Sequence, residues 1–293
     1  MTGPFAADEA LDGVLPRESP PRFTYASDEV GRVSQHIIRL VERCTGQPRI
    51  RRMYEDYVEL QRPHRLFWQD AIAALELDLR LNREPSVCVP ATGPLVIVAN
   101  HPFGVVDGLV LGWMIAQVRS DFQIMTHRIL HQALEVRPHV LPVDFSGTPE
   151  ATANNVRSRR QARDLLDRGG ALIVFPAGGV AAAASFTGPA VERPWGTLAA
   201  KLVLATGAAA LPVFFGGQNS RLFQIAAQIH QTLRYALLFH EVRNKIGARL
   251  AVTIGDVIAN ERLRALPDHR AATEFLWQST HALAVDPTAG DRR

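Results

Sequence analysis

The sequence predicts an α/β fold in which a mainly parallel central sheet of about seven strands is flanked by helices. Short apolar runs typical of buried parallel strands occur repeatedly along the chain. Amphipathic segments of helical period separate most of these runs, as expected for strand-helix-strand crossovers. The chain has 293 residues, 47% of them hydrophobic. That length and content suit one large core with additional helices packed beside it.

The N-terminal part of the chain predicts helices rather than strands. Residues 1–27 are rich in proline and acidic residues, and we expect them to form a flexible tail. Residues 28–74 are expected to form a helical segment beside the sheet. Within it, segment 28–44 is expected to form a helix with one apolar stripe made of Val30, Val33, Ile37, Ile38 and Val41. Pro63 is expected to break the second helix.

The α/β domain itself is expected over residues 75–285, and a second flexible tail over 286–293. Alternating or continuous apolar patterns predict strands at 75–81, 95–99, 122–126, 140–145, 171–175, 209–215 and 249–255. Helical periodicity predicts helices at 107–118, 152–168, 194–206 and 269–285. Gly169 and Gly207 are expected to end the second and third of these helices.

Charge and cysteine content exclude several classes of protein. Lys plus Arg number 32 and Asp plus Glu 29, a net charge of +3, and no basic block is interleaved with aromatic residues. We therefore expect no nucleic-acid partner. Cys44 and Cys88 form neither a CxxC motif nor a metal-ligand spacing, so no metal site is expected.

The sequence also predicts where the protein is found. No uninterrupted apolar run reaches the ~18 residues of a membrane-spanning helix. The N-terminal residues lack the basic start and apolar centre of a signal peptide. The expected location is the cytoplasm, with any membrane contact peripheral.

The three most unusual loops each follow an expected central strand. They are ANHPFGVVDG (99–108), PAGG (176–179) and GGQNS (216–220). Parallel strands place their carboxyl ends at one edge of the sheet, where α/β proteins bind ligands. We therefore expect these loops to form a single site.

The first of these loops contains a histidine and a carboxylate. Imidazole changes protonation near neutral pH and can act as a general base, while a nearby carboxylate fixes its tautomer. Because neither a GxSxG motif nor a cysteine lies near His101, this histidine would activate a hydroxyl of the substrate. The alternative is structural: Asp107 would be a helix N-cap, and His101 an ordinary hydrogen-bonded residue at a strand end.

ANHPFGVVDG resembles the His-Asp motif of the glycerolipid and lysophospholipid acyltransferase superfamily, although five residues rather than the common four separate His101 from Asp107. This longer form is similar to the hemolysin-like and ornithine-lipid acyltransferase-like branch. FPAGGV (175–180) resembles the third block of the family, and ALPVFFGGQNS (210–220) the fourth. The resemblance covers roughly residues 60–260.

The resemblance implies an O-acyltransferase of phospholipid metabolism. It would move a fatty acyl group from acyl-CoA or acyl carrier protein, as co-substrate rather than bound cofactor, to a hydroxyl of a lysolipid-type acceptor. His101 would be the general base and Asp107 would orient it, and the enzyme would work peripherally at the inner face of the membrane. The matching blocks imply substrate-binding residues at Asn100, Pro102, Phe103, Gly104, Phe175, Pro176, Ala177, Gly178 and Gly179.

Three further contacts with the substrate are considered. The backbone N–H groups of Gly178 and Gly179 are expected to stabilise the oxyanion of the transition state. Arg128 is a candidate contact for an anionic substrate group, and a solvated surface arginine is the equal alternative. The arginines of segment 157–168 could meet a CoA phosphate or anionic lipid, but a solvated helix face is the favoured interpretation.

The third block departs from the family pattern because Ala177 and Gly179 occupy the places of its usual acid. In relatives that acid helps to hold the acceptor, so its absence argues against a glycerol-phosphate acceptor and mildly favours the alternative, an amino-acid lipid acylated at a hydroxyl on its fatty chain. Two other classes of function also remain open. Water could replace the acceptor in an acyl-thioester hydrolase, or the chain could be an inactive lipid-binding homologue.

Overall fold

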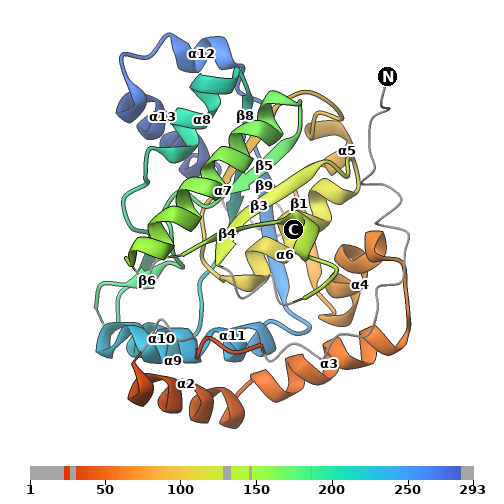
Figure 1. Ribbon diagram of the computed structural model, residues 1–293, viewed down its shortest axis with the longest axis vertical. Coiled ribbons are helices and arrows are strands. Elements are labelled where there is room, and N and C mark those ends of the chain that lie inside the picture. Colours follow the sequence, from red (N-terminus) through yellow and green to blue (C-terminus); the bar gives the residue numbers. More distant parts are fainter. Residues whose placement is uncertain (1–22, 27–30, 128–132, 145–146, 186, 285–293) are drawn as a thin grey trace, which may run out of the picture.

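The computed structural model describes residues 23–26, 31–127, 133–144, 147–185 and 187–284. Within these residues a seven-stranded sheet lies between layers of helices (Figure 1). The strand order is β1-β9-β8-β2-β5-β3-β4, and every neighbouring pair is parallel except β8 and β9. The strands are β1 Asp78–Leu81, β2 Leu95–Ala99, β3 Phe122–His127, β4 Val140–Val143, β5 Ala171–Val174, β8 Ala209–Phe215 and β9 Arg249–Ile254. The predicted fold class is confirmed.

The central strand β2 is buried on both faces of the sheet. Leu95, Ile97 and Ala99 belong to one hydrophobic core, and the two valines between them belong to the other. When all side chains of a strand are buried, its sequence is a continuous apolar run. This strand could therefore be predicted from the sequence. The strand predicted at 75–81 is shorter than expected, because Leu75 still bonds back to Ala71 and closes the preceding helix.

Helices cover both faces of the sheet (Figure 1). On one side α7 (Pro149–Asp167), α8 (Leu198–Thr206) and α13 (His269–His281) contact the strands, and on the other side α6 (Val105–Ala116) contacts β3. The predicted C-terminal ends of α7 and α8 are confirmed, because Gly169 and Gly207 follow these helices with positive φ.

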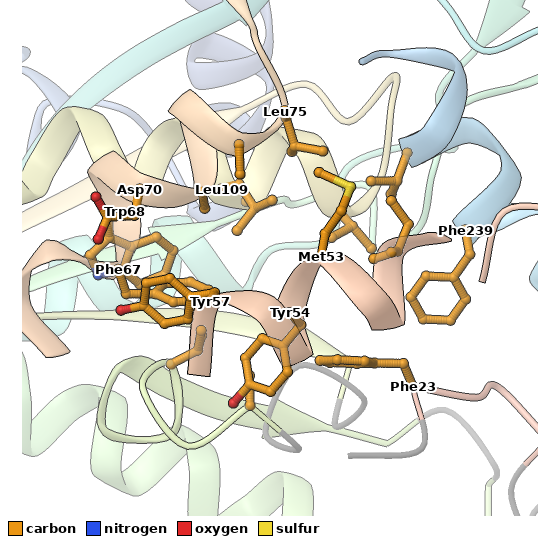
Figure 2. A pocket seen from close by; sticks show the side chains of 18 of the residues that line it. Phe23, Met53, Tyr54, Tyr57, Phe67, Trp68, Asp70, Leu75, Leu109 and Phe239 are labelled. Atoms are coloured by element: carbon orange, nitrogen blue, oxygen red, sulfur yellow. The ribbon is translucent and has the colours of Figure 1, made fainter. Parts of the chain in front are cut away.

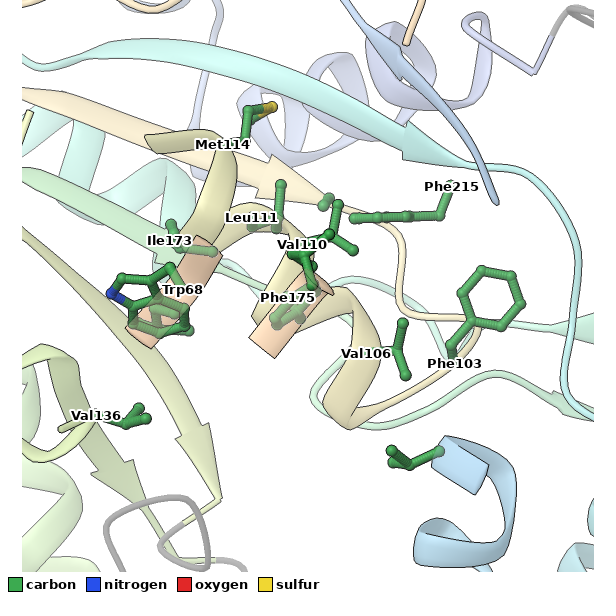
Figure 3. Close-up of a cluster of buried hydrophobic side chains, with 14 of the residues drawn as sticks. Trp68, Phe103, Val106, Val110, Leu111, Met114, Val136, Ile173, Phe175 and Phe215 are labelled. Atoms are coloured by element: carbon green, nitrogen blue, oxygen red, sulfur yellow. The ribbon is translucent and has the colours of Figure 1, made fainter. Parts of the chain in front are cut away.

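The N-terminal part of the chain forms helices beside the sheet, and the last of these helices packs against α6. They are α2 (Arg32–Cys44), α3 (Gln47–Glu59), the 3-10 turn η1 (His64–Leu66) and α4 (Phe67–Ala74), so the break at Pro63 is confirmed. Close packing of α4 on α6 depends on Gly112, where a β-carbon would lie 2.2 Å from the ring of Trp68. Trp68 thereby enters the main core together with Phe175 and Phe215 (Figure 3).

Two expectations about the N-terminal part need correction. Residues 23–26 are packed rather than flexible, with Phe23 8% and Tyr25 7% exposed, because their aromatic rings pack against Tyr54 of α3 and against Phe239. The remainder of both predicted tails lies outside the described residues. On α2, Ile38 of the predicted stripe is buried but Val33 and Ile37 are 75% and 40% exposed, so the stripe is only partly covered.

Several elements were not predicted. They are α5 (Pro85–Cys88), the turn η3 (Arg137–His139), α9 (Arg221–Ile229), α10 (Gln231–Ala236), α11 (Leu238–Asn244), α12 (Asn260–Arg264) and a hairpin of β6 (Ala182–Ala183) and β7 (Ala190–Val191). Helices α9 to α11 lie at the same end of the molecule as α2 and α3 (Figure 1). There α10 contacts both α2 and α9, and α11 contacts α3 and α6.

None of the helices in the described part of the chain is both long and apolar enough to cross a bilayer.

Candidate functional site

The loops after β2, β5 and β8 meet at one edge of the sheet, as predicted, because these three strands are neighbours. The side chain of Asn100 joins the first loop to the end of β8: its Nδ2 donates to the carbonyl of Phe215 at 2.9 Å, and its Oδ1 accepts from the N–H of Phe215 at 2.7 Å. The N–H of Ala181 donates to the carbonyl of His101 at 2.8 Å and ties the loop after β5 to the same point.

His101 and Asp107 form a hydrogen-bonded pair. Nδ1 of His101 lies 2.8 Å from Oδ2 of Asp107, and the N–H groups of Phe103 and Gly104 donate to the same oxygen at 2.9 Å. Because the carboxylate accepts, Nδ1 carries the proton, and the lone pair of Nε2 is left for a substrate. The N-cap of α6 is Gly104, with φ of 88°, so Asp107 is not the cap; it lies in the first helical turn and reaches back to the cap.

The surroundings of Asp107 are apolar with one nearby cation. Burial raises the pKa of Asp107 above its ordinary value, and the hydrogen bonds from His101, Phe103 and Gly104 oppose that rise. Lys245 faces this carboxylate from the segment after α11, with its Nζ 4.4 Å from the centre of the Phe103 ring. Burial lowers the pKa of Lys245, while Glu241 and Asp107 favour its charged form.

A second carboxylate holds the main chain of His101. The N–H of His101 donates to Oε1 of Glu192 at 2.6 Å, and the indole N–H of Trp195 donates to Oε2 at 3.0 Å. Nε2 of His281 lies 3.5 Å from Oε2 of Glu192. The ring of His101 stacks on Phe175 with centroids 4.1 Å apart. The catalytic candidate is therefore fixed through its main chain, through Nδ1 and through one ring face.

Sequence reasoning missed Glu192, although one signal pointed to it. The third block lacks its usual acid, and Glu192 brings a carboxylate to the same loop region from the segment after β7. No spacing rule connects Glu192 to His101, because the two lie far apart in the chain. Lys245 was missed for the same reason.

His101 faces a cavity at this edge of the sheet. Of the predicted residues, Gly104, Phe175, Pro176, Gly178 and Gly179 line it with His101. Helix α10 and its neighbours complete the wall with Gln231, Arg234, Tyr235 and Leu238. The arginine segment of α7 was expected to be a solvated face, and Arg159 is the exception because it lines the cavity.

Four predicted substrate-binding residues do not line this cavity. Asn100, Pro102 and Ala177 are buried behind its wall. Phe103 is 2% exposed and belongs to the core (Figure 3), and the Nζ of Lys245 lies over its ring. These side chains therefore lie outside the lining of this cavity. Arg128, the candidate anion contact, lies outside the described residues.

The two predicted oxyanion donors differ in availability. The N–H of Gly178 donates to the carbonyl of Phe175 at 3.0 Å, closing a turn in which Gly178 has φ of 66°. Gly178 is therefore not available as a donor, which corrects the expectation. The N–H of Gly179 has no hydrogen-bond acceptor among the described residues and lies in the cavity wall.

A second cavity adjoins the first. Val105 and Gly108 on α6 line both cavities, so the two cavities share part of one wall. The wall of the second cavity is almost entirely apolar and includes Phe23, Met53, Tyr54, Tyr57, Phe67, Ala71, Leu75, Leu109 and Phe239 (Figure 2). The N-terminal segment, α3 and α4 thus form an apolar chamber beside the histidine.

Comparison with known proteins gives the family. Residues 39–290 match the family model described as acyltransferase. A solved structure, the 1-acyl-sn-glycerophosphate (LPA) acyltransferase PlsC from Thermotoga maritima, has a TM-score of 0.50 and 14% identity over 85% of this chain and 86% of that chain. That likeness shows the fold, and no curated protein sequence matches the chain. Both findings agree with the resemblance of the His-Asp motif to the glycerolipid acyltransferase superfamily, and the chain belongs to the acyltransferase family.

Proposed function

We propose that this acyltransferase moves a fatty acyl group from an acyl thioester to a hydroxyl of a lysolipid-type acceptor. The observation that carries the proposal is the His101–Asp107 pair, in which a buried carboxylate fixes Nδ1 while the ring borders a cavity. Such a pair removes a proton from a substrate hydroxyl without needing a side-chain nucleophile.

The tautomer of His101, with the proton on Nδ1, determines which ring nitrogen accepts a proton in the reaction. Nε2 of His101 accepts the proton of the acceptor hydroxyl as its oxygen attacks the thioester carbonyl carbon. The tetrahedral intermediate then expels the thiolate, which takes the proton back from the imidazolium, and an ester and a free thiol result. Asp107 stabilises the imidazolium through Nδ1–H and does not itself take the proton. The free N–H of Gly179 is the candidate donor to the developing oxyanion.

The apolar chamber supports a long-chain acyl donor. A chain whose carbonyl lies at His101 would reach the second cavity along the shared wall at Val105 and Gly108. Each buried methylene contributes about 0.8 kcal/mol to binding. The chamber would therefore favour fatty acyl groups over short ones.

A lipid acceptor implies that the enzyme acts at a membrane surface. The exposed residues at the end of the molecule near the site are of the kind that bind such a surface. Helix α2 exposes Val33, Ile37 and Leu40, one or two turns apart, and α9 exposes Leu222, Ile225 and Ile229 in the same pattern. Four arginines, Arg43, Arg49, Arg52 and Arg243, border a groove beside α2. Apolar side chains next to cations are typical of surfaces that bind anionic bilayers, which would place the enzyme at the inner face of a membrane.

Thiol release from acyl-CoA and from acyl carrier protein tests the activity, with a panel of lysolipid acceptors and His101→Ala as the comparison. Release that requires an acceptor and is lost in His101→Ala supports the proposal. His101-dependent release without an acceptor would instead identify a thioesterase. Wild-type turnover in His101→Ala would remove the mechanism, and lipid binding without any release would identify an inactive homologue.

A further inference from the structure

The loop GGQNS (216–220) lies at the same edge of the sheet as His101, but none of its residues lines the His101 cavity. It packs instead against the buried ring that follows His101 in the chain. Gly217 has φ of 108°, and a β-carbon there would lie 3.1 Å from Cζ of Phe103. The side-chain amide of Asn219, which is 2% exposed, donates to the carbonyl of Phe103 at 3.5 Å. GGQNS therefore contacts the catalytic loop away from the cavity.

The same segment holds one cation and one carboxylate. Nζ of Lys245 donates to the carbonyl of Gln218 at 3.2 Å and lies 4.4 Å from the centre of the Phe103 ring. Glu241 on α11 is 1% exposed, and it accepts from the N–H of Ser220 at 2.9 Å and from the Ser220 hydroxyl at 2.5 Å. The loop thus fixes an ammonium group beside the residues that carry the His-Asp pair.

Asp107 uses only one of its two oxygens in the hydrogen bonds described above. Oδ1 is buried and has no hydrogen-bond partner in the part of the chain that the structure describes. Burial of a carboxyl group favours its neutral form, and a neutral Asp107 cannot stabilise an imidazolium at His101. A permanent cation nearby opposes this effect of burial.

Lys245 is the permanent cation that interacts with Asp107. The charge of Asp107 raises the pKa of Lys245, and by reciprocity Lys245 favours the ionised form of Asp107. Among the described residues, the other charged groups that act on the two are His101, on Asp107, and Glu241, on Lys245. His101 contributes a charge only when it is protonated, so Lys245 is the cation that remains when His101 is a free base.

We propose that Lys245 is a positioning residue that acts through Asp107: its ammonium group keeps Asp107 ionised, so that Nδ1 of His101 keeps its proton and Nε2 stays free. This rests on the proposed acyl transfer, in which Nε2 accepts the proton of the acceptor. Without the ammonium, the pair takes up an additional proton more readily, whichever of the two residues carries it. A pair with an additional proton contains no general base.

The pH dependence of kcat/KM tests this role. Lys245→Met keeps an unbranched side chain over Phe103 and removes the charge. Its acid limb is expected to move to higher pH by about one pH unit, with a rate near that of wild type well above the limb. A merely structural change would lower kcat/KM by the same factor at every pH. That result, or an unmoved acid limb, would overturn the proposal.

Two variants control for the change of side chain. Lys201→Met alters an exposed lysine on α8, far from the pair in the sequence, and is expected to keep the wild-type profile. Lys245→Arg keeps the positive charge, so its acid limb is expected to lie closer to that of wild type than to that of Lys245→Met. An acid limb in Lys245→Arg that moves as far as in Lys245→Met would show that the charge is not the cause.

NMR measures the same interaction from the other side and needs no substrate. The sequence contains two lysines, Lys201 and Lys245, so protein labelled with ¹³C at the lysine Cε gives two side-chain signals, and Lys201→Met assigns them. The pKa of Lys245 is expected to fall in Asp107→Asn, because Asp107 favours the charged ammonium. An unaltered pKa would reject the proposal, even if Lys245→Met does not fold.

The titration also separates this inference from the proposed function. If wild-type protein transfers no acyl group to any acceptor, the proposed function fails. A fall in the pKa of Lys245 in Asp107→Asn would then still support the charge interaction behind the His-Asp pair, and no change would reject it.

Discussion

Oδ2 of Asp107 accepts three hydrogen bonds, and this one atom sets both the shape of the loop and the tautomer of His101. In Asp107→Asn a single neutral oxygen must serve the same three donors, and the amide NH₂ cannot accept from Nδ1–H. We expect kcat to fall about 10³–10⁴-fold, with residual turnover. Steady-state thiol release measures this, with the exposed Asp164→Asn on α7 as the control. Near wild-type kcat would show that Asp107 is only structural.

Glu192 is expected to be a positioning residue, because it holds the main chain of His101 without facing substrate. Glu192→Ala should lower kcat about 10-fold to 100-fold, since small displacements of a catalytic group are costly, and leave KM unchanged. Glu192→Gln keeps an acceptor for the His101 N–H and should restore most activity. A loss in KM alone, or no rescue by Gln, would contradict this role.

The imidazole of His281 reports on Glu192 independently. Burial by itself would lower the pKa of His281, but the Glu192 carboxylate and the carbonyl of Trp277 hold it above its ordinary value. In Glu192→Gln the pKa of His281 is therefore expected to fall. Titration of the ring protons by NMR measures the change, and an unaltered pKa would show that the two groups do not interact.

At the scale of elements, α4 and α6 define how much acyl chain the chamber can hold. Ala71 on α4 lines the chamber, and Ala73 on the same helix is exposed and does not. Ala71→Phe should exclude the end of a long chain; loss of two buried methylenes at about 0.8 kcal/mol each lowers kcat/KM about tenfold. Short-chain donors and Ala73→Phe should be unaffected, as a series of acyl-CoA lengths would show. Equal loss at every length would mean that the chain lies elsewhere.

The segment 23–26 closes both cavities, since Phe23 lines the apolar chamber and Tyr25 the His101 cavity. Glu42 on α2 holds it, accepting from the Thr24 hydroxyl at 2.6 Å and the Tyr25 N–H at 2.8 Å. Burial raises the pKa of Glu42 to about 7, and both hydrogen bonds oppose that rise.

A raised carboxyl pKa means that the native state binds more protons than the unfolded state between about pH 4.5 and 7. The free energy of unfolding should therefore fall, by about 1–3 kcal/mol, as pH rises through this window, and then stay level. Glu42→Gln should remove this contribution. Urea unfolding at pH 5 and 8 measures it, with the exposed Glu59→Gln as control. An identical pH dependence in Glu42→Gln and wild type would exclude Glu42 as its source.

At the scale of the whole molecule, the exposed apolar residues of α2 and α9 and the cavity belong to one end, because α10 contacts both helices and lines the cavity. Leu40→Ser and Ile229→Ser should each weaken binding to anionic vesicles about tenfold, the loss of one buried aliphatic side chain. Val87→Ser is a matched control: Val87 is 79% exposed on α5, at the opposite end (Figure 1). Equal effects of all three changes in a vesicle sedimentation assay would reject this docking face.

The part of the site that could be predicted consists of residues that lie close together in the sequence or directly after recognisable strands. His101 and Asp107 lie on one loop and one helical turn, and the loops after β2, β5 and β8 follow strands whose apolar runs are plain in the sequence. Phe103 and Ala177 show the limit of reasoning from a motif: they lie within matching blocks, yet their side chains are buried away from the cavity.

The sequence by itself determined the α/β class, the central strands, the His-Asp pair and the edge of the sheet where the pair lies. Strands buried on both faces appear as continuous apolar runs, and His101 and Asp107 are close together in the chain. Only the tertiary structure decided which distant groups reach that edge. Glu192, Arg234 and Lys245 come from segments with no pattern of their own, and helix packing alone sets their distances to the loop. The exposure of α2 was likewise undecided, since an apolar stripe shows that a helix has an apolar face but not what covers it.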